Sequence, residues 1–409
     1  MGELKLVACL KWYSTFIFLG GTIVGFADPI TDILTLVGFY REDHKTWFAV
    51  GLTFIILPCF VFSLLFCMLK LEEFQRPTSS YKNIFLQVLL CGFNPFSAAL
   101  ARLQGFIFCL KNFKTLWQGN QGDLSEDTDD KWNIEELLFH SELALLFEAV
   151  LESIPQFILQ LYAMSVQQEP VKIIQMISLP VSFLSLAWAF TTADELLQKG
   201  ETQIHVLRMK HKLLLFLTHA VLLSSRLFAI SYFMVSYKWW VIVILTCHSF
   251  AVLVAEAICI CGRCGGDRGT ALILILFFFL NWLRDDWSVK IHDEDNENKR
   301  MLSTRMRLFF NVLFAVENIA MILMFYLTSP YSNTWYSQPV TVCVCLFSVI
   351  GAVARVTHFR FLTKETGSYS TMERNENLSP SEIPVARVSI TSQASQVVII
   401  NQGFRKEDE

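Results

Sequence analysis

The stretch of sequence that decides the fold, Leu145–Tyr162, reads LLFEAVLESIPQFILQLY. It is apolar enough to enter a bilayer, yet Glu148, Glu152, Gln156 and Gln160 recur at every fourth position. Residues four apart lie on one face of an α-helix. These side chains should form a polar stripe that rises about 18 Å, more than half of a hydrocarbon core of about 30 Å. A membrane tolerates such a stripe where it faces water, a protein partner or a polar substrate.

The overall composition is typical of a polytopic membrane protein. Of the 409 residues, 53% are apolar and 17% are charged, whereas a soluble domain averages about 25% charged residues. Lys11 interrupts the first apolar run, and no small-residue cleavage site follows it. We therefore expect no cleavable signal peptide. The net charge of −4 says little, because the charges fall in loops and a tail.

Ten apolar segments can be recognised, near residues 8–39, 47–69, 84–110, 137–165, 171–193, 213–236, 239–261, 270–283, 308–328 and 336–362. Lys and Arg concentrate in cytoplasmic loops. The asymmetry of the 33 Lys and Arg residues is strongest if the third and eighth segments enter and leave the membrane on one side. The basic residues outside the cytoplasmic parts are then Arg41, Lys45, Lys172 and Lys238, with Arg102 and Arg226 inside apolar segments. The sequence thus predicts an all-α membrane protein with eight transmembrane helices and two re-entrant helical hairpins.

The two re-entrant segments, near 84–110 and 270–283, have a suitable local sequence. The first contains CGFNPF at residues 91–96, a turn signal in the middle of the membrane. The second is shorter than the about 20 apolar residues that a spanning helix needs. We assign residues 1–362 to a helical transmembrane domain and the Ser-rich residues 363–409 to a disordered cytosolic tail.

Charged residues within the apolar segments are the main candidates for function. Each unpaired charge in mid-bilayer costs about 2.5–3.5 kcal/mol, so these groups need a hydrated groove, a proton or a partner. We expect Arg226 to pair with a buried carboxylate, for which Glu317 is the candidate. The acids concerned are Asp28, Asp32, Glu148, Glu152, Asp194, Glu256 and Glu317.

Each candidate also has a simpler structural interpretation. The stripe could serve hydrogen bonding between helices, and Asp28 and Asp32 could cap a helix end. His219 and His248 are interpreted as satisfied packing residues. At residues 259–264, Cys259, Cys261 and Cys264 are candidates for palmitoylation, and unmodified thiols are the alternative. A zinc site there would lack a fourth ligand, so no metal is predicted.

Signals of soluble enzymes are absent from the sequence. It contains no phosphate-binding loop, zinc-protease motif, nucleophile elbow or kinase motif set. We therefore predict neither an enzyme nor a cofactor, and any transport would not be driven by ATP.

Three stretches resemble the XK-related proteins. The first comprises Phe147-Glu148 and Leu151–Tyr162, the second is Glu317–Leu327, and the third is Thr31-Asp32. The resemblance implies eight spans with two re-entrant hairpins, cytosolic termini and a plasma-membrane location. It also implies energy-independent phospholipid scrambling that exposes phosphatidylserine. The implied lipid path, with Gln160 added from the stripe, comprises Asp28, Asp32, Glu148, Glu152, Gln156, Gln160, Asp194, Arg226 and Glu317.

The resemblance also bears on activation and partners. Several members of the family are activated in apoptosis by caspase cleavage of the tail, but the only Asp after residue 362 is Asp408. Cleavage of the tail is therefore not expected. Phospholipids are the implied partners, with a lipid-transfer protein or an accessory single-span subunit as further possibilities and no nucleic acid.

Two other functions remain open from the sequence. A membrane receptor or adaptor would dock a cytosolic lipid-transfer protein through loops 111–136 and 194–212. An ion channel or transporter would also use acids in a groove.

Overall fold

A computed structural model describes the chain except at residues 1–9, 70–95, 119–144, 147, 168–169, 202–208, 262–289, 293–297, 301–303 and 377–409. The chain divides into two units, Met1–His358 and Phe359–Glu409. Apart from one short ribbon, the described elements are helices: α1 Ser14–Arg41, α2 Lys45–Leu69, α5 Ser97–Lys111, α6 Phe113–Gln118, the π-helix η3 Ala149–Ser153, α8 Ile154–Val166, α9 Ile173–Glu201, α10 Met209–Tyr237, α11 Trp240–Cys261, α13 Thr304–Thr328 and α14 Ser337–Glu376.

Six helical stretches in the described part of the chain are long and apolar enough to cross a membrane. They lie in α1, in η3 with α8, and in α9, α10, α13 and α14. Two shorter apolar stretches, Lys45–Val61 in α2 and Trp240–Val254 in α11, overlap the two other predicted spans. The total of eight remains a prediction. The two re-entrant hairpins also remain a prediction, because residues 84–95 and 270–283 lie outside the described residues.

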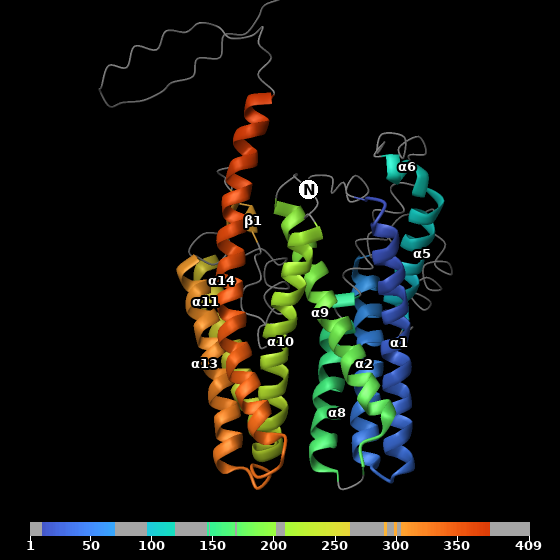
Figure 1. The fold of residues 1–409 in the computed structure, drawn as a ribbon, viewed down its shortest axis with the longest axis vertical. Helices are drawn as coiled ribbons and strands as arrows, with labels where there is room; N and C mark the ends of the chain where they lie inside the picture. The colour runs from blue at the N-terminus through green and yellow to red at the C-terminus, as the bar shows by residue number, and fades with distance from the viewer. Residues whose placement is uncertain are drawn as a thin grey trace, which may run out of the picture. The chain divides into compact units, whose positions relative to one another are not determined.

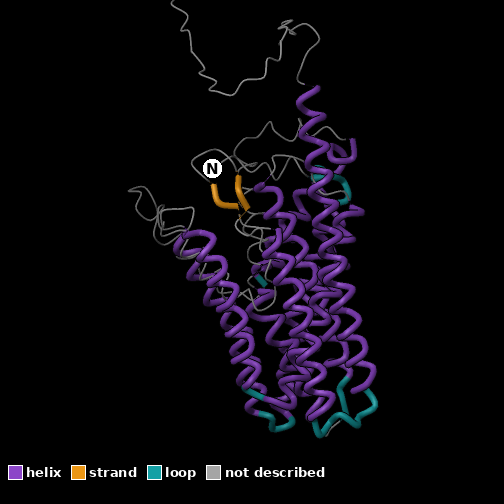
Figure 2. The backbone as a smooth tube through the Cα atoms, turned by 90° about the vertical axis from the view of Figure 1, so that its left-hand side faces the viewer, coloured by secondary structure: helices purple, strands orange, loops and turns teal. Residues whose placement is uncertain are grey.

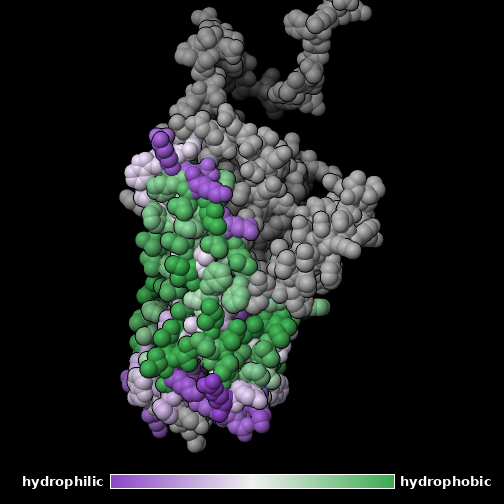
Figure 3. Space-filling model, turned by 90° about the vertical axis from the view of Figure 1, so that its right-hand side faces the viewer, coloured by the Kyte–Doolittle hydropathy of each residue, from purple (hydrophilic) through white to green (hydrophobic). Residues whose placement is uncertain are grey.

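In the first unit the long helices lie side by side (Figures 1 and 2). Helix α1 packs against α2, α5 and α9, while α10 packs against α8, α9, α11 and α13. Figure 3 shows a belt of hydrophobic side chains between hydrophilic zones at the two ends of the face in view. This is the surface expected where helices meet lipid along the middle of their length.

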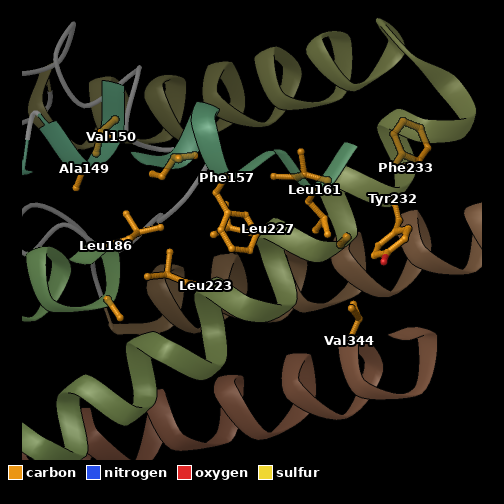
Figure 4. Packing of buried hydrophobic residues seen from close by; sticks show 14 of the residues in the cluster. Ala149, Val150, Phe157, Leu161, Leu186, Leu223, Leu227, Tyr232, Phe233 and Val344 are labelled. Atoms are coloured by element: carbon orange, nitrogen blue, oxygen red, sulfur yellow. The ribbon is translucent and has the colours of Figure 1, made fainter. Parts of the chain in front are cut away.

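The largest hydrophobic core lies around α10. Leu223, Leu227 and Phe233 of α10 are buried against residues of α8, α9, α13 and α14 (Figure 4). Phe157 of α8 packs its ring against Phe228 of α10, with centroids 5.9 Å apart. Since this cluster contains apolar side chains from one face of α8, the opposite, polar face is left to meet α1, α2 and α9.

The turn between α1 and α2 holds these two helices together as neighbours. Asp43 has a φ of 63°, in the left-handed region that Asp adopts more readily than most residues. The N–H of His44 donates to the carbonyl of Phe39 at 2.9 Å. Beside this turn, Lys172 forms a 2.7 Å ion pair with Glu42. The turn therefore lies at the same end of the molecule as the start of α9.

Three local features differ from the sequence predictions. The segment 137–165 is not one regular α-helix, because η3 interrupts it. A short antiparallel ribbon, β1 Lys290–His292 with β2 Asn298–Arg300, was not predicted in the loop 284–307. Helix α14 extends to Glu376, so the first part of the tail predicted as disordered is helical. The remaining tail, 377–409, lies outside the described residues.

Candidate functional site

The polar stripe faces the protein interior. Glu148, Glu152, Gln156 and Gln160 are 8%, 2%, 0% and 1% exposed. They lie between α1, α2 and α9. Helices α2 and α9 pack against η3 and α8, and α1 is linked to them by the hydrogen bonds of Asp28 and Asp32. The sequence left open whether the stripe faces water, a protein partner or a polar substrate. In this conformation the stripe is closed, and its side chains face protein.

The π-helix η3 changes the geometry of the half of the stripe that contains Glu148 and Glu152. Glu148 immediately precedes η3 and Glu152 lies within it, whereas Gln156 and Gln160 lie on the α-helical turns of α8. A π-helical turn takes in more residues than an α-helical turn, and such turns occur frequently at functional sites. Pro155 follows at the start of α8 and has no N–H to continue the α-helical pattern. The backbone thus departs from regular α-helix directly beside Glu152.

Asp28 and Asp32 of α1 lie opposite the stripe and are buried. Ser153 donates to Oδ2 of Asp28 at 2.9 Å, and Ser182 donates to its Oδ1. Both acids lie within α1 rather than at its end, so they are not helix caps.

The second acid, Asp32, joins three helices. Its Oδ1 accepts hydrogen bonds from Gln160 at 3.0 Å and from Ser178 of α9 at 2.7 Å. Gln160 also donates to Ser178 at 3.0 Å. We call the buried set Asp28, Asp32, Glu148, Glu152, Ser153, Gln156, Gln160, Ser178 and Ser182 the polar column.

Helix α2 reaches the column through Gly51. The amide of Gln156 donates to the carbonyl of Gly51 at 2.6 Å. A Cβ atom at Gly51 would clash with the side chain of Leu36 and would lie 3.2 Å from Leu159. The absence of a side chain at Gly51 therefore permits the close approach that this hydrogen bond requires.

Arg102 is a cation near the acid end of the column. It is buried on α5, with its guanidinium against Gly21 of α1. It interacts favourably with the charge of Glu148, whereas Asp28 and Asp32 oppose that charge. Arg102 therefore supplies a positive charge beside Glu148.

The other predicted lipid-path residues form two separate pairs. Asp194 of α9 accepts a hydrogen bond from, or donates one to, His219 of α10 at 2.8 Å. Arg226 of α10 contacts Glu317 of α13 at 3.0 Å, as predicted. His248 of α11 contacts the second oxygen of Glu317 at 2.7 Å.

The Arg226–Glu317 pair has further partners among the neighbouring side chains. Its guanidinium also donates to Asn318 at 2.9 Å and lies 4.2 Å from the ring centre of Phe314. Asn318 donates in turn to Ser225 at 3.3 Å. A fully buried arginine with this many partners holds α10, α11 and α13 together.

Known proteins resemble this chain in sequence. The family model described as XK-related protein matches residues 16–364, which include every element of the polar column. The chain belongs to the XK-related family. It is similar to XK-related protein 9 of Tetraodon nigroviridis, with 26% identity over 201 residues. That alignment covers 47% of this chain and only about half of the relative, 50% of its length.

In this XK-related protein, the structure brings together six of the nine predicted lipid-path residues. Asp28, Asp32, Glu148, Glu152, Gln156 and Gln160 contribute to one column, while Asp194, Arg226 and Glu317 lie in the pairs described above. Sequence reasoning did not identify the column's serines, Gly51 or Asn318 as contributors. Serine and glycine are common in membrane helices, so only the tertiary contacts distinguish these positions.

Other predicted sites are not tested by the structure. The side chains of Cys259 and Cys261, the whole of Cys264, and the side chain of Glu256 lie outside the described residues. Palmitoylation therefore stays a prediction. Among the described residues, no group of three or more His, Cys, Asp or Glu side chains is arranged to hold a metal ion.

Proposed function

We propose that this XK-related protein is a phospholipid scramblase, which lets lipids cross between leaflets without ATP. The observation that carries the proposal is the polar column, in which four carboxyl groups and two amides are buried inside a helical membrane protein. Burying charged groups in a membrane protein costs free energy, and such groups commonly mark a pathway for ions or polar substrates. Membership of the XK-related family supports the same function.

In the proposed mechanism, the headgroup moves along the column while the acyl chains stay in the bilayer. Glu148 and Glu152 bind the cationic part of the headgroup, and Gln156 and Gln160 continue the path as hydrogen-bonding groups. The Arg226–Glu317 and Asp194–His219 pairs hold the helices that frame it. Because the column is closed in this conformation, transport requires α8 to separate from α1 or α2.

The hinge for that movement lies at η3 and Pro155. Regular α-helical hydrogen bonding is already lost there, so a change of helix direction breaks fewer bonds than elsewhere in the span. In cells, the same activity would expose phosphatidylserine on the outer face of the plasma membrane.

The test is a scrambling assay with the purified full chain in liposomes. Lipids labelled on an acyl chain are placed in both leaflets, and dithionite quenches those in the outer leaflet. Active protein should allow nearly complete quenching, while protein-free vesicles stop at about half. The double variant E148Q/E152Q should lower the initial rate by about tenfold or more if these carboxylates each contribute one charge-assisted hydrogen bond.

A matched control is Glu42→Gln, which makes the same chemical change outside the column. Its rate should equal that of the wild type. Ion flux without lipid movement would contradict the proposal and favour a channel. Binding of a cytosolic lipid-transfer protein without either flux would contradict it and favour an adaptor.

A further inference from the structure

Most of the hydrogen-bond donors in the polar column are already engaged. Both N–H groups of Gln160 are engaged, one with Asp32 and one with Ser178. The hydroxyls of Ser153, Ser178 and Ser182 donate to the carboxylates of Asp28 and Asp32. No hydroxyl among them is left to serve another acceptor.

Several acceptors in the column have no hydrogen-bond partner among the residues that the structure describes. They are both carboxylate oxygens of Glu152, the Oδ2 of Asp32 and the Oε1 atoms of Gln156 and Gln160. We call these five oxygens the acceptor cluster. Each is buried, with an exposed area below 1 Å². Buried polar atoms are nearly always hydrogen-bonded in native proteins, so five unpaired oxygens on one set of facing helices indicate a ligand.

The position of Glu152 links this cluster to the rest of the column. Glu152 is 2% exposed, and its carboxylate interacts electrostatically with Glu148, Asp32 and Asp28. The interactions are unfavourable between like charges, and the described residues supply Arg102 as a compensating cation near Glu148. The cluster therefore favours a ligand that is both cationic and a hydrogen-bond donor.

The chemical nature of the acceptor oxygens restricts which cationic group suits them. An ammonium group presents three N–H donors, which it could offer to these oxygens in turn as it moves along the column. A quaternary ammonium group has the same charge and no donor, and proteins usually bind it with aromatic rings. The column offers carboxylate, amide and hydroxyl groups instead.

We infer that the acceptor cluster binds the N–H-bearing ammonium of ethanolamine headgroups and discriminates against choline headgroups. The inference rests on the proposed function, because it assigns a preferred substrate to the same path. A site built to hydrogen-bond its substrate rejects an analogue that lacks the donor, since buried acceptors are then left unpaired.

The experiment uses a series of lipids in which charge is constant and the number of donors falls. Phosphatidylethanolamine, its N-methyl and N,N-dimethyl derivatives, and phosphatidylcholine carry three, two, one and no N–H donors on the ammonium. Each is labelled on an acyl chain, so that the headgroup is intact, and is assayed in liposomes with the full-length protein. The initial scrambling rate should fall along the series, by about fivefold for each hydrogen bond lost.

A variant tests whether the headgroup preference arises at the acceptor cluster. Glu152→Gln supplies N–H donors to the neighbouring oxygens and removes one charge, so the four lipids should move at similar rates. It also removes a buried carboxylate without a partner, and so should fold at least as well as the wild type. Glu42→Gln should keep the wild-type order. Equal wild-type rates for all four lipids would overturn the inference and leave the proposed function intact.

A binding measurement separates failure of the site from failure of transport. Glycerophosphoethanolamine should raise the Tm of the detergent-solubilised full chain, and glycerophosphocholine should not. The effect should disappear in Glu152→Gln. If no lipid is scrambled but this difference is found, the proposed function fails and the site stands. If neither headgroup analogue stabilises the protein in preference to the other, the site is overturned.

Discussion

At the scale of single residues, the need of a buried charge for a partner explains several contacts inside the protein. The sequence predicts the contact between Arg226 and Glu317 because a charge in the membrane needs a partner, and the structure confirms it. The same argument does not predict the role of Gly51, which comes from a tertiary contact with Gln156. It also does not predict that His248 shares Glu317 with Arg226, because a histidine can form hydrogen bonds with several kinds of partner.

The Arg226 cluster should contribute strongly to stability. Glu317→Ala leaves a buried arginine without its carboxylate, and should lower the free energy of unfolding by about 3–5 kcal/mol. Thermal unfolding of the detergent-solubilised protein measures this as a fall in Tm. Lys45→Ala, which removes an exposed ion pair with Asp43, is the control and should cost less than about 1 kcal/mol. Equal losses in the two variants would show that burial of the pair has no effect.

Two glycines allow a matched test of packing. Gly51→Ala should destabilise the protein by about 1–3 kcal/mol, because its Cβ would crowd Leu36 and Leu159. It should also lengthen the hydrogen bond from Gln156. Gly20→Ala on α1 meets nothing within 4 Å and should not lower the Tm. A neutral Gly51→Ala would mean that α2 can move away from α8 at little cost.

At the scale of elements, hydrophobic pattern predicts the existence of the helices well and their irregularities poorly. The polar spacing at Glu148, Glu152, Gln156 and Gln160 correctly places these residues on one side of the span. The pattern does not predict η3, since a spacing of four fits both an α-helix and a slightly wider turn. The structure places η3 in contact with α2 and α9, and the sequence pattern contains no information on these contacts.

The hinge at η3 can be tested with Pro155→Ala. The substitution restores an N–H donor and should allow α-helical hydrogen bonding to continue toward Glu148. We expect a scrambling rate lower by a few-fold with an unchanged or higher Tm, because a hinge favours motion more than stability. Pro180→Ala in α9, another proline within a span, is the control. A lower Tm with an unchanged rate would show that Pro155 serves folding alone.

At the scale of the whole molecule, the charge distribution predicts which ends of the helices share a side of the membrane. The predicted external residues Arg41, Lys45, Lys172 and Lys238 are at or beside helix ends in the structure. Within the first unit, the Glu42–Lys172 ion pair joins two of these ends directly. Loop charges thus predict topology, but they contain no information on how closely α1, α8 and α9 approach one another.

Cysteine labelling tests this topology. Asp43→Cys and Lys172→Cys should react with a membrane-impermeant thiol reagent on intact cells. Lys114→Cys in α6, which Figure 1 places at the opposite end of the first unit, should react only after permeabilisation. The wild-type chain gives the background from native thiols. Labelling of all three positions in intact cells would contradict the predicted orientation.

The depth of the polar column has an electrical consequence. A headgroup that follows it crosses most of the transmembrane voltage, which is worth about 2.3 kcal/mol per elementary charge per 100 mV. Ethanolamine and choline lipids carry no net charge, so their distribution would ignore this voltage. Phosphatidylserine carries one negative charge, and a negative cell interior would drive it outward. The resting potential itself would then bias which lipid accumulates on the cell surface, with no pump involved.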